Sequence, residues 1–269
     1  MAIVDYELAL QDEDGNEYSM NGENVDFIVS ISMYITNERI DREVKTKENS
    51  YLDGSQLISE QRINSRDLTI EYEIAQQDQL VFVQFQNEIT AFLDKAVYLI
   101  NKTHGKRLRV ECTGINARSG EGEFHQHANV TIDFNVLNPF WEDVEETTET
   151  KQSSTDLEVQ FTINNDGYRE TPAIFELVAD QICNKFSIIN ETTNQGVIIE
   201  DIGFGAENFN NYLVDNESGQ VLLEDLLRNR LIKEGTGFFN LQIGSNVITI
   251  ESAVAITATY RFRKRYYYG

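Results

Sequence analysis

The chain has 269 residues and a formal net charge of −23, with 45 acidic residues against 22 basic ones. This length suffices for one large domain or two ordinary ones, each with a buried core. The aromatic fraction of 10% argues against a disordered chain. A surface this acidic repels nucleic-acid phosphates and anionic lipids, so we expect neither sequence-specific nucleic-acid binding nor a membrane partner. The acidity serves solubility, or it lines a passage through which a polyanion slides without sticking.

The two cysteines, Cys112 and Cys183, lie far apart in the sequence and give no compact disulfide framework. A chain of this size needs none, so we expect reduced thiols, as in a protein made in a cytoplasm. The first residues show no basic region followed by an apolar stretch, and no run of about 20 apolar residues occurs. We therefore expect neither a signal peptide nor a membrane span.

Strands and one helix are predicted in the first half of the chain. Alternating apolar residues predict strands at 5–10, 26–36, 68–74, 108–115 and 128–136. The period changes over 78–97, where Phe82, Phe85, Ile89, Phe92 or Leu93, and Ala96 form one apolar stripe after an N-cap at Asp78. We expect a helix here, with its stripe packed against the adjacent sheet.

Residues 37–66 are polar, charged and poor in apolar anchors. The stretch is too long for an ordinary loop. Either it is disordered, or it is a long exposed hairpin that finds its partner on another chain. The candidate residues of such a hairpin are Arg42, Tyr51, Asp53, Gly54 and Arg62.

The second half has the pattern of a β-sandwich, with short strands at regular spacing and turns between them. The expected strands are 157–163, 171–178, 186–190, 196–200, 212–214, 221–223, 237–243, 246–251 and 255–266. Residues 222–231 also suit a short helix, which stays open as an alternative to the hairpin of 212–223.

A junction separates the two halves at Asn138-Pro139-Phe140-Trp141. Proline cannot extend a sheet ladder, so one sheet ends here. We expect a first domain over 1–140, an acidic linker over 141–156 and a second domain over 157–269. Trp141 either stacks on a sugar from an exposed position or, as we favour, fills the seam between two units.

No catalytic constellation stands out, and we predict neither an enzyme, nor a cofactor, nor a metal site. Acidic pairs are common by chance at this composition, and no nucleophile-elbow, zinc-protease or phosphate-loop motif occurs. His125 and His127 share a strand face, with Cys112 on a neighbouring strand, but ligand types without spacing are weak evidence for metal. The basic and aromatic segment 261–269 suggests a nucleic-acid patch or, as we favour, a strand whose arginines meet acidic surface on the same or a neighbouring subunit.

Three stretches together resemble the siphophage distal tail protein family, often called Dit. The first is Asn138 to Trp141, similar to the junction between that family's two domains. The second runs from Asn164-Asn-Asp-Gly167 through 171–177. The third is 239–250, closed by Tyr260 to Tyr266, where the usual Pro-Gly is Ile243-Gly244.

The resemblance implies a mainly β fold: an N-terminal β-sandwich with one helix and a long hairpin, followed by a galectin-like C-terminal β-sandwich. It implies a homo-hexameric ring in the virion, at the tip of a long non-contractile tail. The tail tube protein would lie above, and the tail-tip hub and receptor-binding proteins below. Residues 37–66 would then form an inter-subunit hairpin. A carbohydrate-binding, lectin-like host-adhesion protein is the alternative function.

Overall fold

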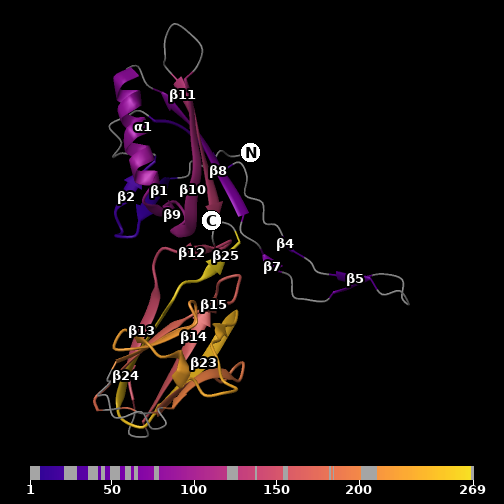
Figure 1. Ribbon diagram of the computed structural model, residues 1–269, viewed down its shortest axis with the longest axis vertical. Helices are drawn as coiled ribbons and strands as arrows, with labels where there is room; N and C mark the ends of the chain where they lie inside the picture. Colours follow the sequence, from indigo (N-terminus) through magenta and orange to yellow (C-terminus); the bar gives the residue numbers. More distant parts are fainter. Residues whose placement is uncertain are drawn as a thin grey trace. The chain divides into compact units, whose positions relative to one another are not determined.

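The computed structural model describes most of the chain. The residues described are 7–20, 29–35, 42–43, 46–48, 55–57, 62–63, 66–75, 79–119, 127–136, 138–153, 157–181, 183, 185–200 and 211–267. They fold as two compact units, Met1–Val144 with Tyr267–Gly269, and Glu145–Tyr266 (Figure 1). Both units are mainly β, as the sequence predicts.

The first unit is built on one sheet with the strand order β2-β1-β9-β10-β11-β8-β3. Its strands are β1 (Leu8–Asp12), β2 (Glu17–Ser19), β3 (Val29–Ile35), β8 (Arg66–Ala75), β9 (Ala96–Asn101), β10 (Lys106–Ser119) and β11 (His127–Val136). The central strand β10 changes partners: it pairs with β9 through Arg109 and with β11 from Val110 onward. Its register shifts between Cys112 and Gly114. A bulge at such a point bends a strand from one layer of a sandwich into the next.

One helix, α1 (Gln79–Leu93), accompanies this sheet, and the predicted stripe is confirmed where its side chains are described, at the buried Ile89 and Leu93. The predicted end of the helix is wrong. The helix stops at a turn in which the N–H of Lys95 donates to the carbonyl of Phe92. Residues 96–101 then form β9, because the apolar run that continues the helical period also suits a buried strand. The predicted cap at Asp78 lies outside the described residues.

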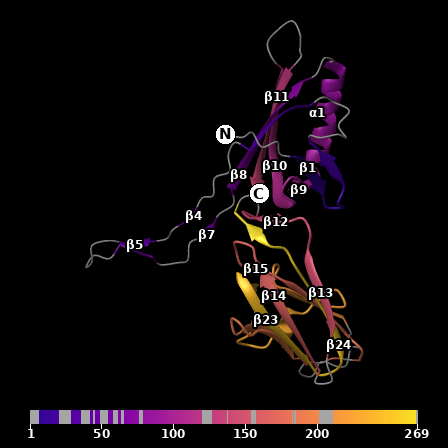
Figure 2. The same cartoon turned by 180° about the vertical axis from the view of Figure 1, so that it is seen from behind.

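The described residues of the polar stretch 37–66 pair with one another as a hairpin. Its strands are β4 (Arg42–Glu43), β5 (Thr46–Glu48), β6 (Ser55–Leu57) and β7 (Arg62–Ile63), with β4 paired to β7 and β5 to β6 (Figures 1 and 2). Neither pair joins another described strand. Tyr51, Asp53 and Gly54 lie outside the described residues. We call β4 to β7 the hairpin.

The second unit is a sandwich of two antiparallel sheets. One has the order β13-β24-β16-β19-β20-β21 and the other β14-β23-β17-β18, and a short pair, β15-β22, stands beside them. The strands are β13 (Thr147–Gln152), β14 (Glu158–Asn165), β15 (Thr171–Pro172), β16 (Ile174–Ala179), β17 (Lys185–Asn190), β18 (Gln195–Glu200), β19 (Asn211–Asp215), β20 (Gln220–Leu223), β21 (Leu226–Leu227), β22 (Asn240–Leu241), β23 (Gly244–Ser252), β24 (Ile256–Phe262) and β25 (Arg265–Tyr266). Strict in–out alternation, as in Val159, Phe161 and Ile163, fills the space between the sheets.

The predicted hairpin of 212–223 is confirmed, because β19 and β20 pair with each other. The alternative, a helix over 222–231, is not found, and a single 3-10 turn spans Asn229–Leu231. One expectation for this half needs correction: the acidic stretch 141–156 is more than a linker, because it contains β12 (Trp141–Asp143) and β13. Its polar, threonine-rich sequence suits a sheet edge, where β13 pairs with β24 and lacks a strongly apolar side chain.

Buried asparagines hold the loops of the second unit. Asn246 is fully buried, and its carboxamide accepts from the N–H of Gln242 at 2.9 Å and donates to the carbonyls of Gln242 and Gly244 at 2.8 and 3.0 Å. Asn190 donates to the same side-chain oxygen at 3.1 Å. Gly244 has φ +93°, which favours glycine, so the side chain of Asn246 and the backbone of Gly244 fix one tight turn together.

Replacement of this asparagine tests the arrangement. We expect Asn246→Ala to lower the free energy of unfolding of the second unit by about 2–3 kcal/mol, because several buried backbone and side-chain groups lose their partner. Thermal and urea unfolding followed by circular dichroism measure the change. Asn240→Ala, at an exposed asparagine of β22, is the matched control. A loss below about 0.5 kcal/mol, the range of ordinary surface changes, would contradict this role.

Candidate functional site

The junction that the sequence singles out is a bulge beside β10. Val136 pairs with Val110 and Glu142 with Arg107, so residues 137–141 intervene on one strand where only Leu108 and Arg109 intervene on the other. The extra residues include Asn138, Pro139 and Phe140. The N–H of Phe140 donates to the side-chain oxygen of Asn138 at 3.3 Å. Proline is tolerated here because a bulge needs no ladder hydrogen bond from it.

Beyond the bulge, β12 is fastened to β10 by ionic contacts. The carboxylate of Glu142 lies 3.7 Å from the guanidinium of Arg107, and Asp143 pairs with Lys106. These four side chains are largely buried, which strengthens charge pairs relative to pairs on an open surface. Arg107 also stacks over the ring of Tyr98, 4.2 Å from its centroid. The start of β10 thus carries a compact polar clamp.

Aromatic side chains accompany this clamp. Trp141 is fully buried and offers no face for stacking on a sugar. Phe140 is half-buried and meets the ring of Tyr267 edge-on, with centroids 5.9 Å apart, so the end of the chain returns to the first unit. That Trp141 fills a seam between units stays a prediction.

The other sequence motifs come together within the second unit. The side chain of Asn165 donates to the carbonyls of Arg169 and Leu241 at 2.9 and 3.3 Å, joining the second motif to the third. A Cβ at Gly167 would lie 3.0 Å from the backbone nitrogen and oxygen of Arg265, so the C-terminal residues pack directly onto this glycine. The hydroxyl of Thr171 donates to the carbonyl of Arg263 at 2.7 Å.

The basic C-terminal residues meet acidic partners in the same unit. Lys264 lies 3.0 Å from Asp166, Arg265 2.6 Å from Glu217, and Arg263 pairs with Glu146. The hydrogen bond from Lys264 lowers the pKa of Asp166. These pairings support the interpretation that the C-terminal arginines meet acidic side chains, and they argue against a nucleic-acid patch.

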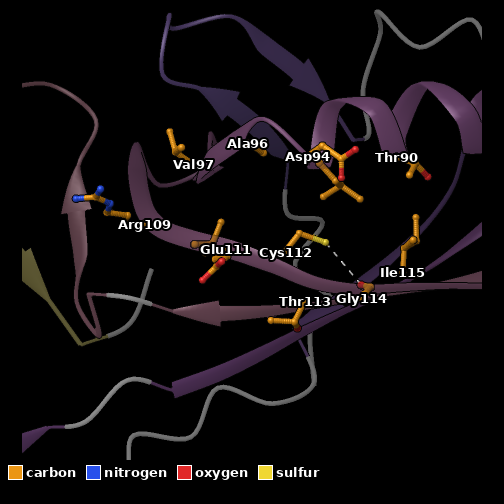
Figure 3. A pocket seen from close by; sticks show the side chains of 12 residues that line it. Thr90, Asp94, Ala96, Val97, Arg109, Glu111, Cys112, Thr113, Gly114 and Ile115 are labelled. Atoms are coloured by element: carbon orange, nitrogen blue, oxygen red, sulfur yellow. Dashed lines mark hydrogen bonds between the residues drawn. The ribbon is translucent and has the colours of Figure 1, made fainter.

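The first unit has a hollow of about 550 Å³ between the end of α1, the start of β9 and β10 (Figure 3). Thr90 and Asp94 line it from the helix side, and Glu111, Cys112 and Ile115 line it from β10. The thiol of Cys112 is half-buried and points toward the carbonyl of Gly114 at 3.8 Å. Burial raises the pKa of Cys112, and the carboxylates of Asp94 and Asp133 raise it further. Nothing in the sequence pattern points to this hollow, since its residues come from three elements.

The described residues hold no cluster of ligating side chains for a metal ion. Cys112 does lie on the strand next to His127, as expected, but Cys112 pairs with Phe134, seven residues along β11 from His127. At about 3.3 Å per residue the two are roughly 23 Å apart, so they share no site. His125 lies outside the described residues. No helix in the described part of the chain has the length and apolar character of a membrane span.

A comparison with protein families follows the same residues. Residues 166–266 match the family described as siphovirus-type tail component, C-terminal domain. The match lies within the second unit, and it confirms the resemblance of the chain to the siphophage distal tail protein family. No curated protein matches the sequence.

Solved structures share the fold of nearly the whole chain. The Dit protein of SPP1, described as a paradigm of the hub adsorption apparatus in phages that infect Gram-positive bacteria, has a TM-score of 0.66 at 11% identity. The match covers 96% of this chain and 98% of that one. Chains of the phage p2 baseplate in its activated conformation with Ca and with Sr have TM-scores of 0.56 and 0.55. Both are 7% identical and cover 98% of this chain and 99% of those chains.

The burial of Trp141 predicts a measurable contribution to the unfolding free energy of the first unit. We expect Trp141→Ala to cost the first unit about 3–5 kcal/mol of unfolding free energy, because a large buried side chain leaves a cavity. Phe140→Ala, at the half-buried neighbour, is the control and should cost clearly less. Circular dichroism is the readout for both variants, since Trp141 is the one tryptophan. Equal losses from the two substitutions would mean that the indole is not the anchor of the junction.

Proposed function

We propose that this chain is a structural virion protein that forms a homo-hexameric ring at the end of a long non-contractile phage tail. The ring joins the tail tube protein above to the tail-tip hub and receptor-binding proteins below. The chain acts by assembly and carries out no reaction. It is made in the cytoplasm of a bacterial host and functions in the virion.

One observation carries this proposal. The fold of the SPP1 hub protein extends over both units of the chain, and the tail-component family match falls within the second unit. A match confined to the second unit would fit any protein with an appended sandwich, because folds of this kind serve many functions. Agreement over 96% of the chain supports a shared role for the whole molecule.

The hairpin supports assembly with further copies of the chain. Two-stranded ribbons are marginally stable alone in water, and neither ribbon of the hairpin joins a described strand of its own chain. The net charge of the region that contains the hairpin also differs from that of the rest of the chain. Residues 37–66 hold six basic and six acidic side chains, so the remaining 16 basic and 39 acidic residues carry the whole −23. A neutral arm approaches an acidic neighbour without the repulsion that other surfaces would meet.

The acidity of the remaining surface suits a ring through which DNA passes. Carboxylates that line the bore would repel the phosphates and leave the nucleic acid free to move. An electron-microscopy reconstruction of the assembled protein tests this idea directly. A bore lined by neutral or basic side chains would remove it.

Deletion of the hairpin tests the assembly. We expect the wild-type chain to have the mass of a hexamer in size-exclusion chromatography with light scattering. Deletion of 42–61 should yield subunits that keep the far-ultraviolet spectrum of a β protein but no longer form the hexamer. A hexamer that survives the deletion would refute the inter-subunit role of Arg42 to Arg62. A wild-type monomer at every concentration would refute the ring and favour the lectin-like alternative, which glycan binding would then test.

A further inference from the structure

The two sheets of the second unit end in four strands, β13, β21, β14 and β18. A free strand edge accepts strands from other chains, so natural sheets protect their edges. β21 is only two residues long. β18 is covered by a loop: the N–H of Lys233 donates to the carbonyl of Ile198 at 2.9 Å, and the N–H of Ile198 donates to the hydroxyl of Thr236 at 3.3 Å. That leaves one side of the sandwich, where β13 of one sheet faces β14 of the other.

β14 is the longest of these edge strands, and among the described strands it pairs with β23 alone. Its free backbone groups follow from the ladder. The carbonyl of Val247 accepts from the N–H of Glu191 at 2.8 Å, so Val247, and Thr249 two residues on, direct their backbone groups toward β17. Gln160 lies opposite Thr249 and therefore turns its own N–H and C=O away from β23, to the open side.

Lys151 of β13 fills the middle of this open edge. Its ammonium donates to the carbonyl of Gln160 at 3.0 Å, lies 3.1 Å from the carboxylate of Glu149, and is 5.0 Å from the centre of the Phe161 ring. Phe161 is fully buried, so the lysine lies where the core between the sheets meets the open side. A strand added to β14 at this point would have to displace it.

Glu149 holds the lysine in place. Both residues lie on the less exposed side of β13, where a sandwich normally has apolar side chains. The hydroxyl of Tyr260 donates to the other carboxylate oxygen of Glu149 at 3.3 Å. Burial raises the pKa of Tyr260, and Glu149 raises it further, so the hydroxyl remains a donor. Inward-pointing charges at a sheet edge are one of the means by which natural proteins prevent edge-to-edge association.

We propose that Lys151 is an autoinhibitory contact that closes the free edge of β14 to strands from other copies of this chain. The ammonium occupies a carbonyl that an added strand would need, and displacing it would separate a charge from its partners. The second units thereby stay apart while the chains associate through other surfaces. The inference does not depend on the proposed ring, because it concerns an edge that stays unpaired in any state of assembly.

A pair of lysine-to-methionine variants tests this contact. Lys151→Met removes the charge and keeps a long side chain. We expect it to associate further, with a mass at least about twice that of the wild type in light scattering, since edge pairing joins two copies. Lys185→Met is the matched control, because the Lys185 side chain is 62% exposed, lies on the interior strand β17 and pairs with Glu200. It should keep the wild-type mass. Lys151→Arg should keep it too, because a guanidinium can make the same two polar contacts.

Hydrogen exchange locates the association. By alternation the amides of Glu158, Gln160 and Thr162 face the open side of β14, and in the wild type they should exchange quickly. In associated Lys151→Met they should exchange at least about tenfold more slowly, because a second copy would accept their hydrogen bonds. Circular dichroism checks the fold. If the single variant leaves Glu149 unpaired and does not fold, Glu149→Gln combined with Lys151→Met removes both charges and is measured in the same way.

The inference is overturned by a folded Lys151→Met protein, single or combined, that keeps the wild-type mass. Equal association of Lys185→Met would overturn it as well, and so would association without slower exchange in β14, which would place the contact on another surface. A double variant that does not fold would show that the pair serves the fold itself. Every mass is compared with that of the wild type, so a chain that forms no ring would refute the proposed function and leave this test intact.

Discussion

The backbone of β10 is the constraint on which the first unit depends. A strand of 14 residues must satisfy hydrogen-bonding groups on two sides, and no single neighbour runs along its full length. The chain meets this requirement with β9 on one side of its start, and with β12 and then β11 on the other. β11 and β12 pair with successive parts of β10 on the same side. The bulge at Asn138 to Phe140 is the connection between them. The hollow has the same origin, because β9 pairs with β10 only as far as Arg109 while β10 continues to Ser119.

Charge is arranged around the same constraint. The chain has few basic residues for its acidity, and many of those described are held in specific pairs. Lys106 and Arg107 clamp the start of β10 to β12, and Lys264 and Arg265 fasten the C-terminal residues to the turns that they cross. The pairs of Lys264 and Arg265 involve exposed carboxylates, and pairs of this kind contribute little to stability, roughly 0–1 kcal/mol each. Their larger effect is geometric, because each pair favours one register between two segments. The chain as a whole stays strongly acidic, which keeps copies apart except where a neutral or basic segment meets them.

The alternation of apolar residues was sufficient to predict most strands, because one face of each is buried in a core. This holds for β8, β11, β14 and the β17–β18 hairpin, where the buried residues repeat at every second position in the parts whose side chains are described. The strands that the sequence did not reveal lack that signal. β9 follows the helix so closely that its apolar run extends the helical period, and β13 is polar on both faces at an edge. The hollow could not be predicted from the sequence either, because its lining depends on how far β9 pairs along β10. Local propensity carries no information about such long-range register.

The short motifs that predicted the family are places where a side chain or a missing Cβ replaces ordinary strand pairing. Asn165 satisfies two carbonyls from distant segments, Gly167 admits the backbone of Arg265, and Asn246 holds the turn at Gly244. An apolar core position accepts many residues of similar volume, so it drifts freely. A buried carboxamide with several backbone partners, or a glycine under a crossing strand, has almost no substitute. Constraints of this kind do not depend on the particular apolar residues of the core, so a fold persists when most of those residues change. They also account for why a few polar and glycine motifs identified this chain when its general composition did not.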